Sequence, residues 1–243
     1  MVDSFAVSQG GDAPVIRVGD VLGKSFGLFA GRWAPFVGLA LVAFAPRFVF
    51  ELAVPQAGGA VFVTWLLQTA CTSLADAAII YGVVQELRGR GFTFQESLSA
   101  GFGRMGVVLG LSLGVGILVF LAAILLVIPG VIVATVYAVA IPVCVAERLG
   151  VGASMTRSGF LTRGNRWRIF GILLLVGIVT IVDLLPLRAV AAFVGGLRLE
   201  QVVAYLIEAA AGAFNAVVAG VLYYQLRVGK EGVDIERIAA VFD

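Results

Sequence analysis

The chain has 243 residues, of which 60% are hydrophobic and 13% charged, and its formal net charge is +2. Soluble domains contain about 45–50% apolar and about 25% charged residues, so this composition excludes a soluble globular protein and predicts a membrane protein. The sequence has no histidine, which excludes His-dependent zinc sites, Ser-His-Asp triads and histidine proton relays. Its two cysteines, Cys71 and Cys144, lie in apolar runs and indicate buried hydrophobic residues rather than a disulfide or a metal site.

The first residues of the chain are polar. Segment 1–14 has no basic region followed by an apolar core, so we expect a flexible cytoplasmic tail rather than a cleaved signal peptide. Residues 15–243 are expected to form a single transmembrane domain, whose first helix inserts without cleavage.

Six segments are apolar over most of the roughly 20 residues that a helix needs to cross a bilayer. The predicted spans are 36–54, 59–84, 105–128, 131–145, 169–187 and 201–225. The third and fourth spans are separated because the charge-free stretch 105–146 is too long for one helix and Pro129-Gly130 lies near its middle. Proline removes a hydrogen-bond donor and clashes with the preceding helical turn. The expected fold class is therefore all-α, a polytopic membrane protein with six transmembrane helices.

The basic residues alternate between the two sides of these spans. Most Lys and Arg fall before the first span, between the second and third, between the fourth and fifth, and after the sixth. Arg188 and Arg198 fall on the other side, and Arg47 lies within the first span. Cytoplasmic loops are enriched in Lys and Arg, so the spans are predicted to lie in a cytoplasmic membrane with both termini in the cytoplasm. The alternation supports the split at Pro129-Gly130, because five spans would put the basic segments on opposite sides.

Three cytoplasmic segments resemble one another. In each, a residue suited to a helix start lies six positions before a phenylalanine: Asp20 and Phe26, Glu96 and Phe102, Ser154 and Phe160. The first and third segments continue into Arg32-Trp33 and Arg166-Trp167, and tryptophan collects at the level of the lipid headgroups. We expect three amphipathic helices at the inner interface, each followed by a transmembrane hairpin, as three parallel repeats.

Segment 127–173 and the C-terminal tail contain a recognisable set of short motifs. They are Ile128-Pro129-Gly130, Ile141-Pro142-Val143, Glu147, Thr156-Arg157-Ser158, Leu161-Thr162-Arg163-Gly164, Trp167-Arg168, Leu222-Tyr223-Tyr224-Gln225-Leu226-Arg227 and Glu231-Gly232. With these motifs the chain resembles the membrane domain fused to some bacterial glycerophosphodiester phosphodiesterases, with stand-alone relatives of the YciC type. The resemblance implies six spans and basic cytoplasmic loops. It does not imply an activity, because the phosphodiesterase of the fused proteins is a separate domain whose residues this chain lacks.

Charged side chains within spans are costly in a bilayer and are the first candidates for function. Arg47 and Glu51 lie four residues apart in the first span, Asp183 lies in the fifth, and Glu208 and Asn215 share a face of the sixth. These residues could form a polar cavity that binds a proton, a cation or a polar headgroup. The alternative is a structural ion-pair network in which Arg47 pairs with Asp183 or Glu208.

Asp76 stands apart from that set, in the inner half of the second span. Thr72 lies one turn before it and Gln68 two turns before it. Asp76 could be a protonatable site or a neutral residue bonded to a neighbouring helix, and the sequence favours neither.

The loop between the fourth and fifth spans is the most basic. Its arginines either set the topology alone or also contact anionic lipid headgroups, each worth about 1 kcal/mol near the surface. The candidate headgroup contacts are Arg157, Arg163, Arg166 and Arg168.

The leading functional hypothesis is a non-enzymatic inner-membrane protein that engages lipid or a partner membrane protein, in envelope or lipid homeostasis or in assembly. A small transporter or channel that uses the intramembrane acids is the alternative, and an intramembrane enzyme ranks last. We expect no catalytic residues, metal, cofactor or nucleic-acid partner. The expected partners are membrane lipids, with a second copy of the chain or another membrane protein left open.

Overall fold

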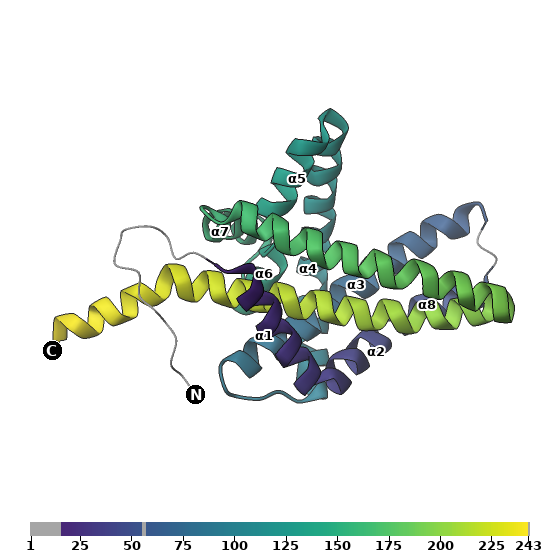
Figure 1. Cartoon of the computed structure of the whole chain (residues 1–243), viewed down its shortest axis with the longest axis horizontal. Helices are drawn as coiled ribbons and strands as arrows, with labels where there is room; N and C mark the ends of the chain where they lie inside the picture. Colours follow the sequence, from purple (N-terminus) through teal and green to yellow (C-terminus); the bar gives the residue numbers. More distant parts are fainter. Residues whose placement is uncertain (1–15, 55–56, 243) are drawn as a thin grey trace.

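The computed structural model describes residues 16–54 and 57–242, apart from the side chains of 181–185, 188, 191–192, 195, 197 and 232–242. The expected tail 1–14 lies outside the described residues. The chain is 89% helical, and the described part contains no strand. Its helices are α1 (Val18–Gly31), α2 (Trp33–Ala53), α3 (Gly59–Leu87), α4 (Phe94–Leu125), α5 (Val127–Val136), α6 (Ala140–Glu147), α7 (Val151–Thr162) and α8 (Arg166–Phe242) (Figure 1).

Five segments of the described part are long and apolar enough to cross a membrane: Trp33–Ala53, Gly59–Leu87, Phe94–Leu125, Val127–Glu147 and Arg198–Glu231. They correspond to five of the predicted spans, which confirms an all-helical protein with several membrane-length helices. The remaining predicted span, 169–187, lies in the first arm of α8. This long helix is two helices joined at Gly196, where φ is 70° and ψ is −170°, and the chain turns back on itself there (Figure 1).

The break between the third and fourth predicted spans differs from the expected position. It lies at Leu126, whose backbone is extended with φ −165° and ψ 147°, and not at Pro129-Gly130. Pro129 is in the first turn of α5, where a missing N–H costs little because no helical acceptor precedes it. Gly130 instead allows close packing, because a Cβ added to it would lie 2.9 Å from the Cβ of Ala123.

The fourth membrane-length segment is itself interrupted. α5 ends at Val136 and α6 begins at Ala140, so the last carbonyl groups of α5 lack helical partners. The Val136 carbonyl accepts hydrogen bonds from the hydroxyls of Ser158 at 2.8 Å and Thr162 at 3.2 Å. Both donors are on α7, so this helix satisfies a backbone carbonyl that the break between α5 and α6 leaves without a helical partner.

The expected second interfacial helix is not separate. α4 runs without interruption from Phe94 to Leu125, so segment 96–102 is the first part of the third membrane-length helix. Thr93 is its N-cap, in a capping box that Glu96 completes as the N3 residue. The first and third expected interfacial helices are separate elements, α1 and α7.

These three segments bury small residues and expose large ones. Their phenylalanines are largely exposed: Phe26 66%, Phe102 60% and Phe160 50%. Buried next to them are Ser25, Gly101 and Ser158. Small residues at helix interfaces allow the close helix packing that is typical of membrane proteins. The three segments therefore present aromatic side chains outward while they pack tightly inward.

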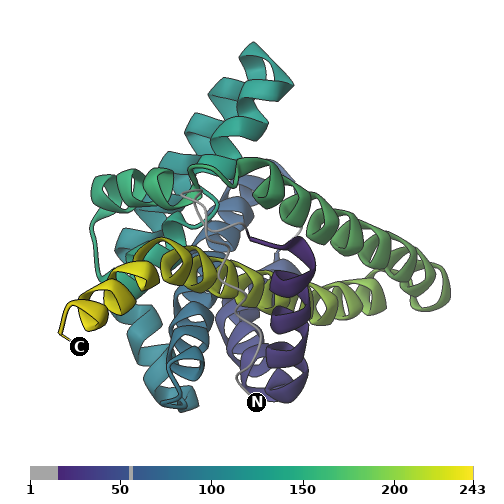
Figure 2. The same ribbon diagram turned by 60° about the vertical axis from the view of Figure 1, so that its left-hand side comes forward.

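The tightly packed core surrounds the C-terminal half of α3. Small residues allow the neighbouring helices to approach it: a Cβ added to Gly101 of α4 would lie 2.9 Å from the Cβ of Ala78, and one added to Gly220 of α8 would lie 2.7 Å from Val83. Away from this core the hairpins diverge. The α4–α5 hairpin rises from the bundle, and the α8 hairpin extends in another direction (Figure 2).

Candidate functional site

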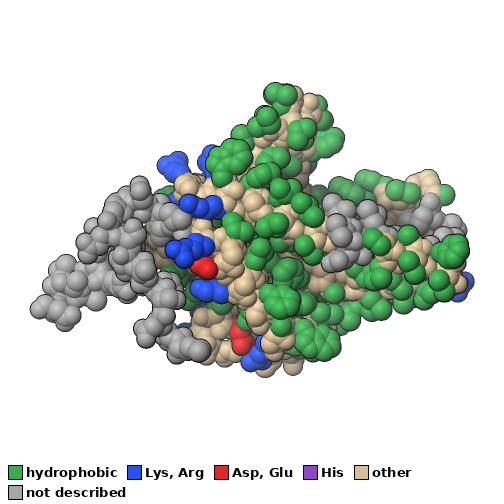
Figure 3. Space-filling view, in the orientation of Figure 1, with side chains coloured by type: hydrophobic (Ala, Val, Ile, Leu, Met, Phe, Trp, Pro, Cys, Tyr) green, Lys and Arg blue, Asp and Glu red, His purple; other side chains and the backbone are tan. Residues whose placement is uncertain are grey.

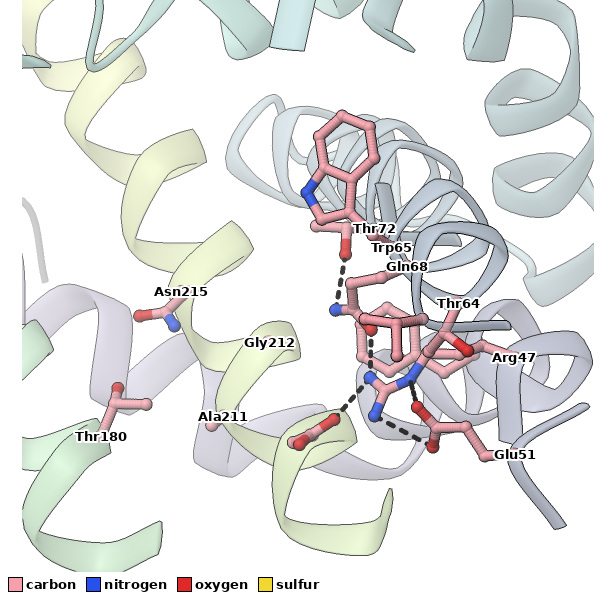
Figure 4. A pocket seen from close by; sticks show the side chains of 13 residues that line it. Arg47, Glu51, Thr64, Trp65, Gln68, Thr72, Thr180, Ala211, Gly212 and Asn215 are labelled. Carbon is pink, nitrogen blue, oxygen red and sulfur yellow. Dashed lines mark hydrogen bonds and ion pairs between the residues drawn. The ribbon is translucent and has the colours of Figure 1, made fainter. Parts of the chain in front are cut away.

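A polar cavity lies between α2, α3 and both arms of α8, with a volume of about 530 Å³. The lining residues are Phe44, Arg47, Glu51, Val61, Thr64, Trp65, Gln68, Thr72, Thr180, Glu208, Ala211, Gly212 and Asn215 (Figure 4). Charged side chains in an apolar, membrane-length helix are costly in a bilayer unless they are paired. The cavity is therefore the main candidate site within the membrane-length helices.

Arg47 is the centre of the cavity's hydrogen-bond network. Its Nε donates to Glu51 at 2.8 Å and its Nη1 donates to Glu208 at 2.6 Å. It also donates to Gln68, and Gln68 Nε2 in turn donates to Thr72 at 3.2 Å (Figure 4). One guanidinium thus connects α2 to α3 and to the second arm of α8, which fixes the relative positions of three helices.

The structure brings together four of the five residues predicted for this site. Arg47, Glu51, Glu208 and Asn215 all line the cavity, whereas the side chain of Asp183 lies outside the described residues. The ion pair between Arg47 and Glu208 is one of the two pairings expected from the sequence.

Sequence reasoning missed the contribution of α3 to this site. Gln68 and Thr72 were grouped with Asp76, but they lie in the wall of the cavity and bond to the Arg47 network. Gln68 and Thr72 are four residues apart, and Thr64 and Trp65 lie one turn before Gln68. This spacing places a stripe of side chains that can form hydrogen bonds on one face of α3. That stripe is the sequence signal for the missing wall.

Asp76 is half-buried and lies one helical turn beyond Thr72, outside the lining of the cavity. Among the described side chains no hydrogen bond or ion pair to Asp76 is found. Both interpretations of this residue, a protonatable site and a neutral packing residue, stay predictions.

A second candidate surface is the end of the molecule that carries most of the basic residues. Figure 3 shows Lys and Arg side chains gathered toward the left of the view, whereas hydrophobic side chains cover the α4–α5 and α8 hairpins. Arg163, Arg166 and Trp167 are exposed here. Arg168 is half-buried and donates to Asn165 Oδ1 at 3.1 Å. This end can therefore present positive charge and aromatic rings together.

Arg157 takes a different position from the other three predicted headgroup contacts. Its Nε donates to Glu147 at 3.0 Å and its guanidinium also bonds to Glu231. Burial alone lowers the pKa of Arg157, but the hydrogen bond to Glu231 and the charge of Glu147 outweigh it and raise the pKa above its ordinary value. Arg157 thus stays positively charged and connects Glu147 to Glu231 within the protein.

The Arg157 network continues onto α8. Arg227 donates to Glu231 at 2.9 Å and to Tyr223 Oη at 3.1 Å, and Tyr223 donates to Glu147 at 3.0 Å. These residues join α6, α7 and the second arm of α8. They also belong to the two stretches that carry the family resemblance, so the motifs that are far apart in the sequence meet in one cluster.

No family model, curated protein or solved structure matches this chain. The geometry of the cavity and of the basic end is therefore the basis for assigning a function. The cavity can bind a polar group within the apolar part of the molecule, and the basic end can bind an anionic surface.

Proposed function

We propose that the chain is a non-enzymatic, six-span protein of a bacterial inner membrane, with both termini in the cytoplasm, whose basic end engages anionic lipid headgroups. In this arrangement the first arm of α8 is the additional span, and the residues on the basic end are cytoplasmic. The chain would act in envelope or lipid homeostasis or in assembly, together with lipid, a second copy or a partner membrane protein.

The observation that carries the proposal is the combination of exposed aromatic rings with arginines at one end of the molecule. Trp167 is exposed next to the exposed Arg166, and Trp33 is exposed next to the exposed Arg32. The three repeat phenylalanines are exposed as well. Aromatic residues favour the headgroup level, where their rings meet the acyl chains. Basic residues at the same level attract anionic lipid, each by about 1 kcal/mol. The proposed threefold repeat accounts for the recurrence of this pattern in α1, α4 and α7.

A specific observation also favours the second candidate function, a small transporter or channel. The cavity at Arg47 places two carboxylates and neutral polar groups among membrane-length helices. A transported ion or molecule needs such a site. The Arg47 network is equally compatible with a purely structural role, since it holds three helices together. An intramembrane enzyme remains the least supported function.

Native mass spectrometry of the protein released gently from its membrane tests the lipid proposal. The test variant is Arg166→Gln and the matched control is Arg198→Gln. Both arginines are exposed on α8, but Arg166 begins its first arm and Arg198 follows the turn at Gly196, at the other end of that arm. We expect anionic lipid to copurify with the wild type and the control, and to be reduced in the variant. A triple variant that also replaces Arg163 and Arg168 should lose it. Equal lipid content in all four proteins would refute the proposal.

A further inference from the structure

A second cavity, of about 520 Å³, lies between the C-terminal half of α3, the first turns of α4 and the residue that ends α6. It shares no lining residue with the cavity at Arg47. A volume of this order suits a small organic ligand and exceeds what a single ion needs. We call it the Arg148 cavity, and its polar and charged lining residues are Tyr81, Thr93, Gln95, Glu96, Ser99 and Arg148.

The carboxylate of Glu96 is fixed at the start of α4 by the capping box. Its Oε2 accepts a hydrogen bond from the Thr93 backbone N–H at 3.1 Å, and the Glu96 backbone N–H donates to the Thr93 hydroxyl at 3.2 Å. Among the described residues, the other carboxylate oxygen, Oε1, receives no hydrogen bond. The backbone therefore positions this negative charge and leaves one oxygen to accept from a ligand.

Arg148 is the C-cap of α6 and has a left-handed backbone, with φ 54°. Glycine is the usual residue in this conformation at the end of a helix, because a Cβ is unfavourable there. Within the described ranges, Arg148 is the one non-glycine residue with a positive φ. The next residue is tied to its surroundings, since the Leu149 carbonyl accepts from Arg104 Nη1 at 3.4 Å and from Cys144 Sγ at 3.5 Å. The backbone thus presents the Arg148 guanidinium to the cavity.

The two charges of the cavity do not neutralise each other. Arg148 and Glu96 line the same cavity, yet no ion pair or hydrogen bond joins them in the part of the chain that the structure describes. A purely anionic ligand would be attracted by Arg148 and repelled by Glu96, and a purely cationic ligand would meet the reverse. A ligand that carries both charges a few atoms apart is complementary to both side chains.

We infer that the Arg148 cavity binds a zwitterion of the phosphoethanolamine type, with its phosphate on Arg148 and its ammonium on Glu96. A guanidinium can bind a phosphate through two parallel hydrogen bonds. Tyr81 Oη accepts from Gln85 Nε2 at 2.9 Å, so the Tyr81 hydroxyl proton is available to another phosphate oxygen. The Ser99 hydroxyl is a further donor in the same lining.

This zwitterion occurs both as a small soluble molecule and as the headgroup of a zwitterionic lipid. In the proposed orientation, residues 93–100 precede the predicted span 105–128 on its cytoplasmic side, where both sources are within reach. The inference does not rest on the binding of anionic lipid, which concerns other arginines, so each can fail without the other.

Two experiments on the full chain in maltoside detergent separate the two sources. In the first, O-phosphoethanolamine is titrated into the protein in a calorimeter, with inorganic phosphate and ethanolamine as probes that carry one of the two groups each. In the second, native mass spectrometry measures the binding of phosphatidylethanolamine to the delipidated protein. The comparison lipids are phosphatidylcholine, whose ammonium has no N–H, and the anionic phosphatidylglycerol.

We expect saturable one-to-one binding of the zwitterion in at least one experiment, at least about tenfold tighter than that of each comparison probe. Saturation in the calorimeter identifies a soluble zwitterion, whereas binding confined to the lipid identifies the headgroup. Arg148→Gln and Glu96→Gln each remove one charge and should weaken binding by at least about tenfold. Both sites tolerate substitution, because glutamine also completes a capping box and because Arg148→Gly, a second variant, suits the left-handed backbone.

The matched control is Arg90→Gln, which replaces an exposed arginine between α3 and α4 that does not line the cavity. It should bind the zwitterion as the wild type does. The inference is overturned by the absence of saturable binding in both experiments, or by phosphate, ethanolamine or phosphatidylglycerol binding as tightly as the zwitterion. Unchanged binding in Arg148→Gln or Glu96→Gln, or an equal loss in Arg90→Gln, would also overturn it.

Discussion

The packing of α4 on α3 depends on Gly101, and the substitution Gly101→Ala tests this directly. A Cβ at position 101 would lie 2.9 Å from the Cβ of Ala78 and 3.1 and 3.2 Å from its backbone N and Cα. Carbon atoms in favourable contact are about 3.5–4.0 Å apart. Because the obstacle is backbone, a rotamer change cannot relieve the contact and one helix must move.

The magnitude follows from two opposing effects. Overpacking of a core costs about 1–3 kcal/mol, whereas alanine is better than glycine in a helix by about 1 kcal/mol. Gly101→Ala should therefore lower the free energy of unfolding by about 0–2 kcal/mol. The matched control is Gly103→Ala on the same helix, where an added Cβ meets no atom within 4 Å. The control should raise the free energy of unfolding by up to about 1 kcal/mol.

Reversible unfolding of both variants in mixed micelles, by titration with a denaturing detergent, measures the difference. The two variants should be separated by about 1–3 kcal/mol, with the control the more stable. Equal stability of the two variants, or a gain in stability from Gly101→Ala, would show that α3 and α4 do not approach each other as closely as described.

Three further predictions concern the start of α4, the Arg157 network and the topology. Thr93→Ala removes the N-cap of α4 and should cost about 1 kcal/mol in the unfolding assay, with faster amide exchange confined to the first turn of α4; a global rise in exchange would argue against a local cap. Arg157→Gln leaves two carboxylates without their shared partner. It should lower the free energy of unfolding by about 1–2 kcal/mol, between the ranges for exposed and buried ion pairs, and should speed proteolysis after α7. Unchanged digestion would show that the network does not hold α8. A cysteine at Arg198 should react with a membrane-impermeant maleimide in intact cells, and one at Lys24 only after lysis, and the reverse pattern would refute the proposed orientation.

Hydropathy and charge could predict much of this fold, because both act over whole segments. A run of about 20 apolar residues identifies a membrane-length helix without knowledge of its neighbours. The pair Arg47 and Glu51 was likewise predictable, because a spacing of four residues places both on one helix face. The link from Arg47 to Glu208 spans 161 residues and could be anticipated only as one of two pairings.

Helix boundaries and neutral polar residues were harder to predict. Pro129 indicated a break, but proline is tolerated in a first helical turn, so the break lies before it at Leu126. The sequence suggested Glu96 as the start of this helix. The N-cap is Thr93 instead, whose hydroxyl accepts a hydrogen bond from the Glu96 backbone N–H. Gln68 carries no charge to mark it, and its place in the cavity depends on the packing of α3 against α2 and α8.

The break after Val136 has a consequence for the order of events during synthesis. An unpaired carbonyl in the bilayer costs several kcal/mol, and the hydroxyl groups that pair with Val136 come 22 and 26 residues later in the chain. At about 5–20 residues per second, a ribosome delivers them about 1–5 s after Val136. During this interval the α4–α5 hairpin must keep that carbonyl hydrated or bound by the insertion machinery. The Val136 carbonyl gains its two hydroxyl partners only after α7 has been synthesised.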